Sequence, residues 1–258
     1  DNNSSDNSRE ICKSRYGERV FFLSLLENVG FGRANNEGIK IAKGKNVFLL
    51  NPDTILLNNA VKILSEFLDN HINVAICGGN LYTKELEPIH SYLMYLPSLY
   101  SEVDQLFGER LSFRRYGNNL FFNHTEKPLN VGYVTGADMM IRKSVLDEAG
   151  YFDPDFFMYF EETELTFRIR KMGYDVMSVP DARIIHLEGQ SVQLKEYREN
   201  MFLQSRRLYL RKTSRSRIIF LLCQIIYGIN ALIHVVYFSS FRKERELLKI
   251  WKYRLKNF

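Results

Sequence analysis

Helix-forming segments alternate with short apolar runs in the first third of the chain, and this alternation restricts the fold more than any other feature. Residues 33–43 predict a helix, and the apolar run 47–50 that follows has the length and composition of a buried strand. The same order then repeats, with a helix capped by Asn58 and an apolar strand at 74–77. Helices that alternate with buried strands predict an α/β fold in which helices flank a mostly parallel sheet.

The middle of the chain continues this pattern with less regularity. Residues 81–130 are rich in Tyr and Phe but weakly periodic, so they predict irregular structure over the sheet. Residues 131–142 predict a strand interrupted by a glycine, and the apolar spacing along 161–173 predicts a helix. Short strands are then expected at 175–179 and 183–186.

The size and composition of the chain exclude several classes of protein. Its 258 residues suit one α/β domain with a C-terminal extension, and 45% apolar residues are too many for a disordered chain. Cys12, Cys77 and Cys223 lie far apart without a C-x-x-C spacing, which argues against a zinc knuckle or a disulfide framework. A reducing compartment is therefore expected, and the N-terminal residues carry no signal-peptide pattern that would predict export.

The charge of the chain is divided unevenly between its two parts. Residues 195–258 hold 15 Lys and Arg against 4 Asp and Glu, a net charge of +11, which leaves −6 for residues 1–194. A basic segment of this kind attracts nucleic acid or anionic lipid. The apolar content of the segment favours lipid, so nucleic acid is not an expected partner.

One stretch within this basic segment has the composition of a membrane-associating helix. Residues 218–241 contain no charged side chain, and these 24 residues are enough to span a bilayer core of ~30 Å. Gln224, Asn230 and His234 interrupt the stretch, so an amphipathic helix or hairpin in the membrane interface is supported as well as a span. A helix buried in the core is the third interpretation. The sequence thus predicts a domain at 1–195 and a membrane-associating helical tail at 196–258.

Polar or acidic clusters lie at three places where a strand gives way to a loop or a helix begins, at residues 1–6, 51–53 and 161–164. Ligands of parallel α/β sheets bind at the carboxyl ends of the strands, so these clusters are expected to surround one pocket. Asp53 directly follows an apolar strand, which would hold its carboxylate where it can bind Mg²⁺ or Mn²⁺ together with phosphate oxygens. An ordinary Pro-Asp turn is the alternative interpretation.

Two further features have both a structural and a functional interpretation. Glu161, Glu162 and Glu164 at a helix start favour the helix dipole, but their mutual repulsion would also raise a carboxyl pKa and make a general base. His186, at the end of a strand, is interpreted either as a metal ligand or as a hydrogen-bonded histidine of the core.

Four motifs occur in an order that resembles a known family. They are DNNSSD at 1–6, NVGFGRANNEGIKIAKGKNVFLLNPDT at 28–54, TGADMMIRKSVLDEAGYFDPDFFMYFEETELTFRIRKMGY at 135–174 and HLEGQS at 186–191. Together they resemble the family-2 glycosyltransferases of the GT-A (Rossmann-like) fold, and are most similar to the rhamnosyltransferase-like branch. The resemblance extends over roughly residues 1–215.

This resemblance implies a role for each matching position. Asn51-Pro52-Asp53 stands at the family's D-x-D site, with Asp53 as a ligand of Mg²⁺ or Mn²⁺ and Asn51 in place of the first Asp, and His186 is kept as the second candidate ligand. Glu161-Glu162 matches the family's Glu-Asp pair, which makes Glu162 the expected catalytic base and Glu161 the alternative. Asp1 is expected at the nucleotide base. The further positions implied in donor or acceptor binding are Asn28, Gly30, Asn35, Asn51, Gly136, Ala137 and Asp138.

The resemblance also implies the activity and its location. An inverting transferase is expected to move a sugar, rhamnose by analogy, from a nucleotide-diphosphate donor to a glycan or lipid-linked acceptor at the cytoplasmic face of the bacterial inner membrane. A homodimer is left open. The family's pattern starts with a strand, a helix and a second strand that precede the first motif here, so the chain is interpreted either as a fragment or as a degenerate relative. The alternative function is that of a non-catalytic nucleotide-sugar-binding relative or of a partner subunit in polysaccharide assembly.

Overall fold

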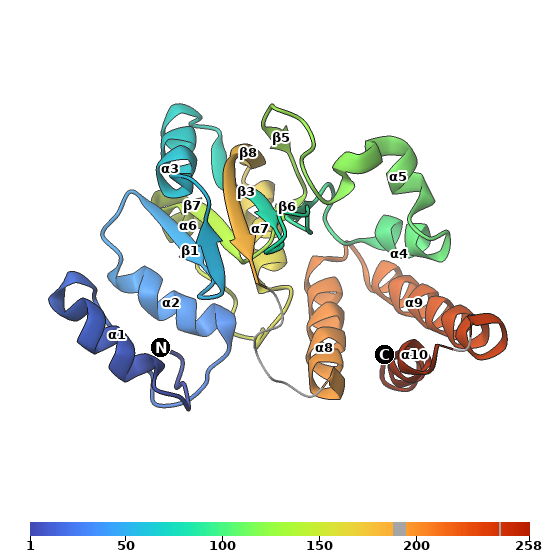
Figure 1. Cartoon of the computed structure of the whole chain (residues 1–258). Coiled ribbons are helices and arrows are strands. Elements are labelled where there is room, and N and C mark those ends of the chain that lie inside the picture. The colour runs from blue at the N-terminus through green and yellow to red at the C-terminus, as the bar shows by residue number, and fades with distance from the viewer. Residues whose placement is uncertain (188–194, 243) are drawn as a thin grey trace.

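A computed structural model describes residues 1–187, 195–242 and 244–258. In this part of the chain a six-stranded sheet forms the centre (Figure 1), with the order β1-β7-β3-β8-β2 and with β5 paired to β8. The strands are β1 (Asn46–Leu50), β2 (Thr54–Leu56), β3 (Val74–Tyr82), β5 (Leu129–Asn130), β7 (Asp138–Arg142) and β8 (Asp175–His186), with β4 (Tyr92–Leu93) and β6 (Tyr133–Val134) as a separate antiparallel pair.

The sheet is mixed, which corrects the prediction of a mostly parallel one. β3 and β8 run parallel, but β7 lies between β1 and β3 and is antiparallel to both. β2 and β5 are also antiparallel to β8. The alternation of helix and strand correctly implied that β1 and β3 share a direction, because a helix connects them. It carried no information on which strand lies between them.

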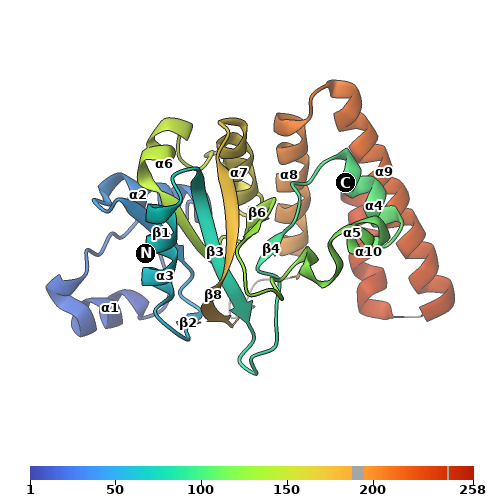
Figure 2. The ribbon, with the colours of Figure 1, turned by 90° about the horizontal axis from the view of Figure 1, so that it is seen from above.

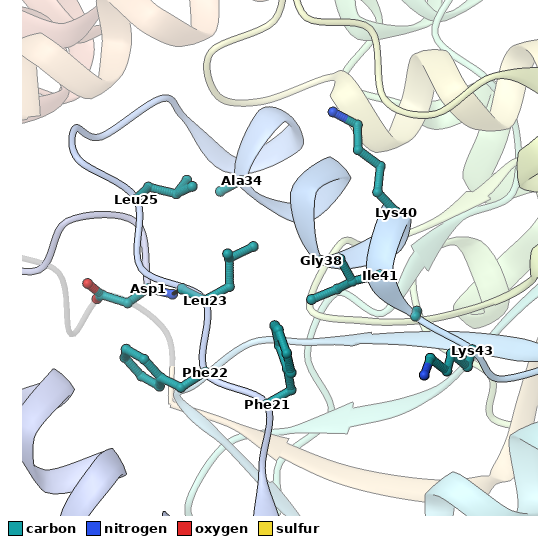
Figure 3. A pocket seen from close by; sticks show the side chains of 11 residues that line it. Asp1, Phe21, Phe22, Leu23, Leu25, Ala34, Gly38, Lys40, Ile41 and Lys43 are labelled. Carbon is teal, nitrogen blue, oxygen red and sulfur yellow. Dashed lines mark hydrogen bonds between the residues drawn. The ribbon is translucent and has the colours of Figure 1, made fainter. Parts of the chain in front are cut away.

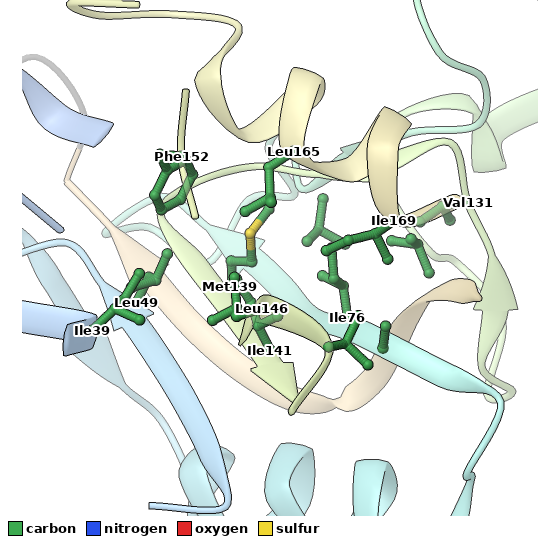
Figure 4. Packing of buried hydrophobic residues seen from close by; sticks show 14 of the residues in the cluster. Ile39, Leu49, Ile76, Val131, Met139, Ile141, Leu146, Phe152, Leu165 and Ile169 are labelled. Carbon is green, nitrogen blue, oxygen red and sulfur yellow. The ribbon is translucent and has the colours of Figure 1, made fainter. Parts of the chain in front are cut away.

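Helices cover both faces of the sheet because successive side chains of each strand point to opposite faces. Met139 and Ile141 of β7 face one side, where α2 (Phe31–Ile41), α6 (Lys143–Ala149) and α7 (Glu161–Lys171) pack. Figure 4 shows Leu165 and Ile169 of α7 above this side of the sheet. Met140 points to the other side, against α3 (Ala60–Asn70). The result is a three-layer α/β/α domain, so the predicted fold class is confirmed.

The segment predicted to be irregular contains two short helices, α4 (Leu99–Leu106) and α5 (Arg110–Tyr116), which lie beside the C-terminal helices (Figure 2). Their periodicity escaped detection because α4 buries polar residues, among them Glu102 and Asp104. Glu102 is 4% exposed and forms an ion pair with Arg206, so this helix packs through a charged contact rather than through an apolar face.

The basic C-terminal segment forms three helices that pack on the domain. They are α8 (Lys195–Thr213), α9 (Arg217–Tyr237) and α10 (Arg245–Asn257), with a π-helical turn at Phe238–Arg242 between the last two. Tyr209 and Leu210 of α8 are buried against Phe156 and neighbouring aromatic residues. The first of the three helices is therefore part of the folded body, whatever the others do at a membrane.

The N-terminal segment carries the remaining described elements, which lie at the opposite end of the molecule from these helices in Figure 1. They are α1 (Ser8–Tyr16) and the 3₁₀ turn Gly17–Arg19. Elsewhere in the chain, a second 3₁₀ turn at Gly117–Leu120 follows α5. The segment then runs past α2. Leu25 N–H donates a hydrogen bond to the Asp1 carbonyl, which connects the first residue of the chain to this part of the segment.

Candidate functional site

The turn that precedes α7 holds its backbone in an unusual conformation. Tyr159 and Phe160 have φ angles of 70° and 66°, the left-handed region that costs a non-glycine residue about 1 kcal/mol or more. The Phe160 ring packs against Phe202 and Tyr209 of α8, which holds the turn in place. The strain is located immediately before Glu161 and Glu162, which this turn places at the start of the helix.

The two glutamates differ in their access to solvent. Glu161 is 4% exposed and its Oε2 has no hydrogen-bond partner among the described residues, whereas Glu162 is partly exposed and accepts a hydrogen bond of 3.1 Å from the Thr163 hydroxyl. Burial, and then the charge of Glu162, raises the pKa of Glu161 to about 8. Burial also raises the pKa of Glu162. Glu162 is therefore the member of the pair that a ligand can contact, and its raised pKa makes it the better proton acceptor.

Glycines bring two other segments against this pair. A Cβ atom at Gly136 would lie 3.9 Å from Cβ of Glu162 and 3.3 Å from the Phe31 ring, and one at Gly32 would lie 3.5 Å from Cβ of Glu161. The loop before β7 and the first turn of α2 therefore border the glutamates closely.

Gly30 allows a close packing contact, and its role in donor binding stays a prediction. Its φ is +89°, and a Cβ atom there would lie 2.2 Å from the Phe157 carbonyl oxygen. The next residue, Phe31, donates its N–H to the same oxygen at 2.9 Å. Only glycine allows α2 to begin this close to the segment that leads into α7.

A second polar cluster forms where β2 pairs with β8. The antiparallel register sets Thr54 opposite His186, although the two residues are more than a hundred positions apart in the chain. This pairing brings Nε2 of His186 to 3.3 Å from Oδ1 of Asp53 and to 3.5 Å from Nδ2 of Asn51. The two residues predicted as metal ligands therefore lie side by side. Residues 188–191 of the fourth motif lie outside the described residues.

The chemistry of this pair fits a divalent cation. The carboxylate of Asp53 and the imidazole of His186 are both partly accessible, at 25% and 14% of their side-chain surface. Within the described ranges no group of three or more His, Cys, Asp or Glu forms a metal cluster. Two protein ligands leave the remaining positions to water and phosphate oxygens, which is how Mg²⁺ and Mn²⁺ bind with nucleotides. The imidazole nitrogen favours Mn²⁺ of the two.

Backbone contacts connect the two clusters. Asn51 donates its N–H to the Ala137 carbonyl at 2.9 Å, and Ala137 follows Gly136, the residue that borders Glu162. Asn51 in turn lies beside His186. A series of contacts at the end of the sheet where β1 and β8 finish thus leads from Asp53 and His186 to the glutamates.

The remaining N-terminal positions expected in donor binding have structural contacts instead. The Asn28 side-chain oxygen accepts from the Gly30 N–H at 3.0 Å and from Asn2, and Asn35 donates to the Phe31 carbonyl at 3.0 Å. These contacts shape the loop that leads into α2. The part of these residues in donor binding stays a prediction.

Asp1 lies in a different place from the other candidates. Its carboxylate accepts hydrogen bonds from the N–H and the hydroxyl of Ser4, and it lines a cavity of about 1000 Å³. Figure 3 shows the apolar walls of this cavity, with Leu23 and Leu25 on the N-terminal segment and Ile41 on the helix across from it. None of the other predicted site residues lines the cavity. Its contact with a nucleotide base stays a prediction.

Asp138 does not line the site, and the prediction that it does is wrong. Its side chain is fully buried, and Oδ2 accepts a hydrogen bond of 2.6 Å from the Gly79 N–H of β3. Burial raises the pKa of this carboxyl well above its usual range. The alternation of side chains along β7 turns Asp138 into the sheet, where it binds a neighbouring strand.

Sequence reasoning missed two residues that shape the site. Asn36 of α2 exchanges two hydrogen bonds with the backbone of Phe152, at 2.8 and 2.9 Å, and so ties the helix to the segment before the glutamates. Tyr133 of β6 is partly buried near Glu162, whose charge adds to burial in raising the pKa of the phenol. The polar Asn35-Asn36 pair inside a helix was a signal for the first residue. No local sequence pattern indicates Tyr133.

Comparison with known proteins gives a consistent set of matches. The family model described as glycosyl transferase family 2 matches residues 1–150. A hexosyltransferase of low-salt glycan biosynthesis from Haloferax volcanii is 24% identical over 218 residues, which cover 83% of this chain and 66% of that protein. An N-acetylglucosaminyl-diphospho-decaprenol L-rhamnosyltransferase from Mycobacterium tuberculosis is 34% identical over 67 residues, 26% of this chain and 21% of that one.

The fold is similar to that of solved enzymes. The crystal structure of GalNAc-T7 with UDP, GalNAc and Mn²⁺ superposes with a TM-score of 0.58 at 15% identity, covering 98% of this chain and 46% of that one. The chain thus spans at most 66% of the length of the three proteins compared.

Proposed function

The chain belongs to glycosyl transferase family 2, and from this premise we propose that it transfers a sugar from a nucleotide-diphosphate donor to an acceptor hydroxyl with inversion at the anomeric carbon. The observation that carries the proposal is that a series of contacts connects a candidate metal-binding pair with a carboxyl group of raised pKa. Asp53 and His186 form a carboxylate–imidazole pair, and contacts through Asn51 and Ala137 lead from it to the raised-pKa carboxyl of Glu162.

Each group has one task in the proposed reaction. Glu162 accepts the proton of the acceptor hydroxyl, whose oxygen forms a bond to the anomeric carbon while the bond from that carbon to the diphosphate oxygen breaks on the opposite side. A divalent cation held by Asp53 and His186 would supply charge neutralisation for the departing nucleoside diphosphate. Glu161 is the buried neighbour of Glu162, and burial together with the charge of Glu162 raises the pKa of Glu161 to about 8.

The donor and acceptor are proposed by class. The Haloferax relative is named a hexosyltransferase and the mycobacterial relative an L-rhamnosyltransferase acting on a diphospho-decaprenol sugar. We accordingly place hexoses and 6-deoxyhexoses such as rhamnose first among donors, and glycans or lipid-linked sugars first among acceptors.

A donor-hydrolysis screen tests the function. The protein is incubated with Mn²⁺ and single nucleotide sugars, namely the UDP, GDP and dTDP derivatives of glucose, mannose, N-acetylglucosamine and rhamnose where these exist, and the released nucleoside diphosphate is measured. We expect release with one donor or a few, and little release after chelation of the metal. A non-catalytic relative would bind a nucleotide sugar without release, and that outcome would overturn the proposal in favour of a binding role.

The membrane association proposed for this enzyme rests on α9. The helix, with the turn after it, is long and apolar enough to cross a bilayer by length and composition (Arg217–Ser240), and only 28% of that window is buried. One side packs inward through Cys223, Tyr227 and Ala231. The other side is apolar and at least 40% exposed at Ile218, Leu221, Leu222, Ile225, Ile229, Leu232, Ile233, Val236 and Tyr237. We propose that this face lies in the anionic cytoplasmic surface of a membrane, next to the basic residues that flank the helix.

Two acidic substitutions on this face should weaken the binding of the protein to lipid vesicles. Burial of an Ile side chain contributes roughly 1.5–3 kcal/mol, so the double variant Ile225→Glu, Ile229→Glu should bind phosphatidylglycerol vesicles at least about tenfold more weakly in a flotation assay. Ile72→Glu, at a position 79% exposed beyond the end of α3, is the matched control and should float as the unaltered protein does. Equal flotation of the double variant would remove α9 as the membrane-binding face.

A further inference from the structure

A second cavity lies between the domain and the C-terminal helices. It has a volume of about 440 Å³ and is bounded by β4, β6, α4, α8, α9 and α10. Volumes of this size are usual for small-molecule sites, which combine apolar walls with a few polar groups. None of the residues discussed so far as metal ligands or as the base lines it.

Both arginines that line this cavity are already paired with carboxylates, and the pKa of Glu109, which also lines it, is raised by burial and by the charge of Asp104. Arg206 forms an ion pair of 2.5 Å with Glu102, and the two side chains are 6% and 5% exposed. Arg254 binds both carboxylate oxygens of Glu199, at 2.6 and 3.1 Å. Because each arginine has a carboxylate partner, the cavity is not built for a phosphate or another anion. A neutral ligand fits its electrostatics better.

Polar atoms without partners belong to the same wall. Asn230 and Tyr227 of α9 line the cavity and are 4% and 3% exposed. Oδ1 of Asn230 and the hydroxyl of Tyr227 have no hydrogen-bond partner among the described residues. Buried polar groups normally have partners, so these two indicate a ligand that brings hydroxyl groups.

Aromatic rings form much of the remaining wall. Tyr95, Tyr133, Phe160, Phe202 and Trp251 come from five different segments and meet around the cavity. A sugar ring has apolar C–H faces and a rim of hydroxyls, so it matches a wall that alternates aromatic surface with amide and phenol groups.

The cavity also adjoins the proposed base. Tyr133 lines the cavity, and its phenol is close enough to the Glu162 carboxylate to be affected by its charge. Phe160, another lining residue, lies two positions before Glu162 in the turn that starts α7. A ring held here would have its hydroxyls near the carboxylate that is to accept a proton.

We propose that this cavity binds the sugar ring of the acceptor, with Asn230 and Tyr227 hydrogen-bonded to its hydroxyls. This assignment rests on the proposed function and extends it to α9 and α10, beyond the residues that the family model matches. It implies a neutral, hydroxyl-rich acceptor unit beside Glu162. The apolar outer side of α9 belongs to the same helix, so an acceptor sugar attached to a lipid would reach the cavity from the membrane surface.

The single tryptophan of the chain makes binding directly measurable. Trp251 lines the cavity and stacks on His234 at 4.0 Å between ring centroids. We expect its fluorescence to change saturably on titration with at least one of the methyl or hexyl glycosides of glucose, galactose, N-acetylglucosamine and rhamnose. UDP and dTDP should leave the emission unchanged. No donor and no turnover are needed, so the result is independent of the transfer reaction.

Two variants on α9 show whether the predicted contacts form. Asn230→Ala and the more conservative Tyr227→Phe should each raise the Kd of the responding glycoside about three- to tenfold, the effect of one lost hydrogen bond. Tyr197→Phe, at a position on α8 that is 50% exposed and does not line the cavity, is the matched control and should leave the Kd unchanged.

The assignment fails if no glycoside changes the emission of the folded protein up to about 50 mM, or if both variants bind as tightly as the control. Release of nucleoside diphosphate in the donor screen together with such a failure would leave the proposed function standing without this acceptor site. Saturable glycoside binding without any donor hydrolysis would support the site and contradict the transferase.

Discussion

Replacement of Glu162 by Gln should lower kcat of sugar transfer by about 10²–10⁴-fold, because general base catalysis contributes that much when a carboxylate takes the proton of the nucleophile. The substitution keeps the size of the side chain and its hydrogen bond with Thr163, so donor binding should change little. Turnover of the unaltered protein should also rise with pH, since a base acts only when it is deprotonated. Burial raises the pKa of Glu162 above 4.5, which moves this rise toward neutral pH.

The neighbouring Glu161 provides the comparison. Glu161→Gln should reduce kcat far less than Glu162→Gln, because the buried side chain does not reach the acceptor. Its effect should appear in stability instead. The raised pKa of Glu161 means that stability present below pH 4.5 is lost as the pH rises to about 8, so Glu161→Gln should raise Tm at pH 8 more than at pH 5. If Glu161→Gln abolished transfer and Glu162→Gln did not, the roles of the pair would be reversed.

The glutamate pair also shows which part of such an assignment can be predicted from the sequence. The motif limits the proposed base to two adjacent residues, because three carboxylates at a helix start are conspicuous. Which of the two is accessible depends on the strained turn at Tyr159 and Phe160 and on the aromatic packing of α8 behind it. Those are tertiary contacts between segments about forty residues apart, and no local pattern encodes them.

The sheet, too, could be predicted from the sequence only in part. The helix–strand alternation predicted an α/β fold and the shared direction of β1 and β3, since a connecting helix requires it. The insertion of β7 between them, and the burial of Asp138 that follows, depends on pairing between distant strands. Of the two aspartates predicted at the site, Asp53 follows a strand and is partly exposed, whereas Asp138 begins β7 and is fully buried.

The strand register matters most at the two predicted metal ligands. His186 and Asp53 were each ambiguous in the sequence, one a frequent core residue and the other a frequent turn residue. The antiparallel pairing of β2 with β8 sets Thr54 opposite His186 and brings the two side chains to 3.3 Å. Neither residue alone argues for a metal, but a carboxylate and an imidazole in contact at a partly open sheet edge do.

Replacement of Asp53 by Ala should therefore abolish turnover, with at least about a 10³-fold fall in kcat, because charge stabilisation by a bound metal contributes several kcal/mol to the barrier. The fold should survive. The side chain is partly exposed, and the turn is held by backbone bonds such as Leu187 N–H to the Asp53 carbonyl, which the substitution leaves in place. Asp181→Ala, at an exposed position on β8, is the matched control and should retain transfer.

The metal role has a readout apart from activity. Titration of Mn²⁺ in the presence of UDP or dTDP, followed by electron paramagnetic resonance, should show binding to the unaltered protein that weakens at least about 100-fold in Asp53→Ala, since one of its two protein ligands is gone. His186→Ala should weaken binding as well, because the pair acts as one site. Near-normal transfer by Asp53→Ala, or unchanged Mn²⁺ binding, would mean that the carboxylate–imidazole contact only fastens β2 to β8. The diphosphate would then have to be neutralised by other groups.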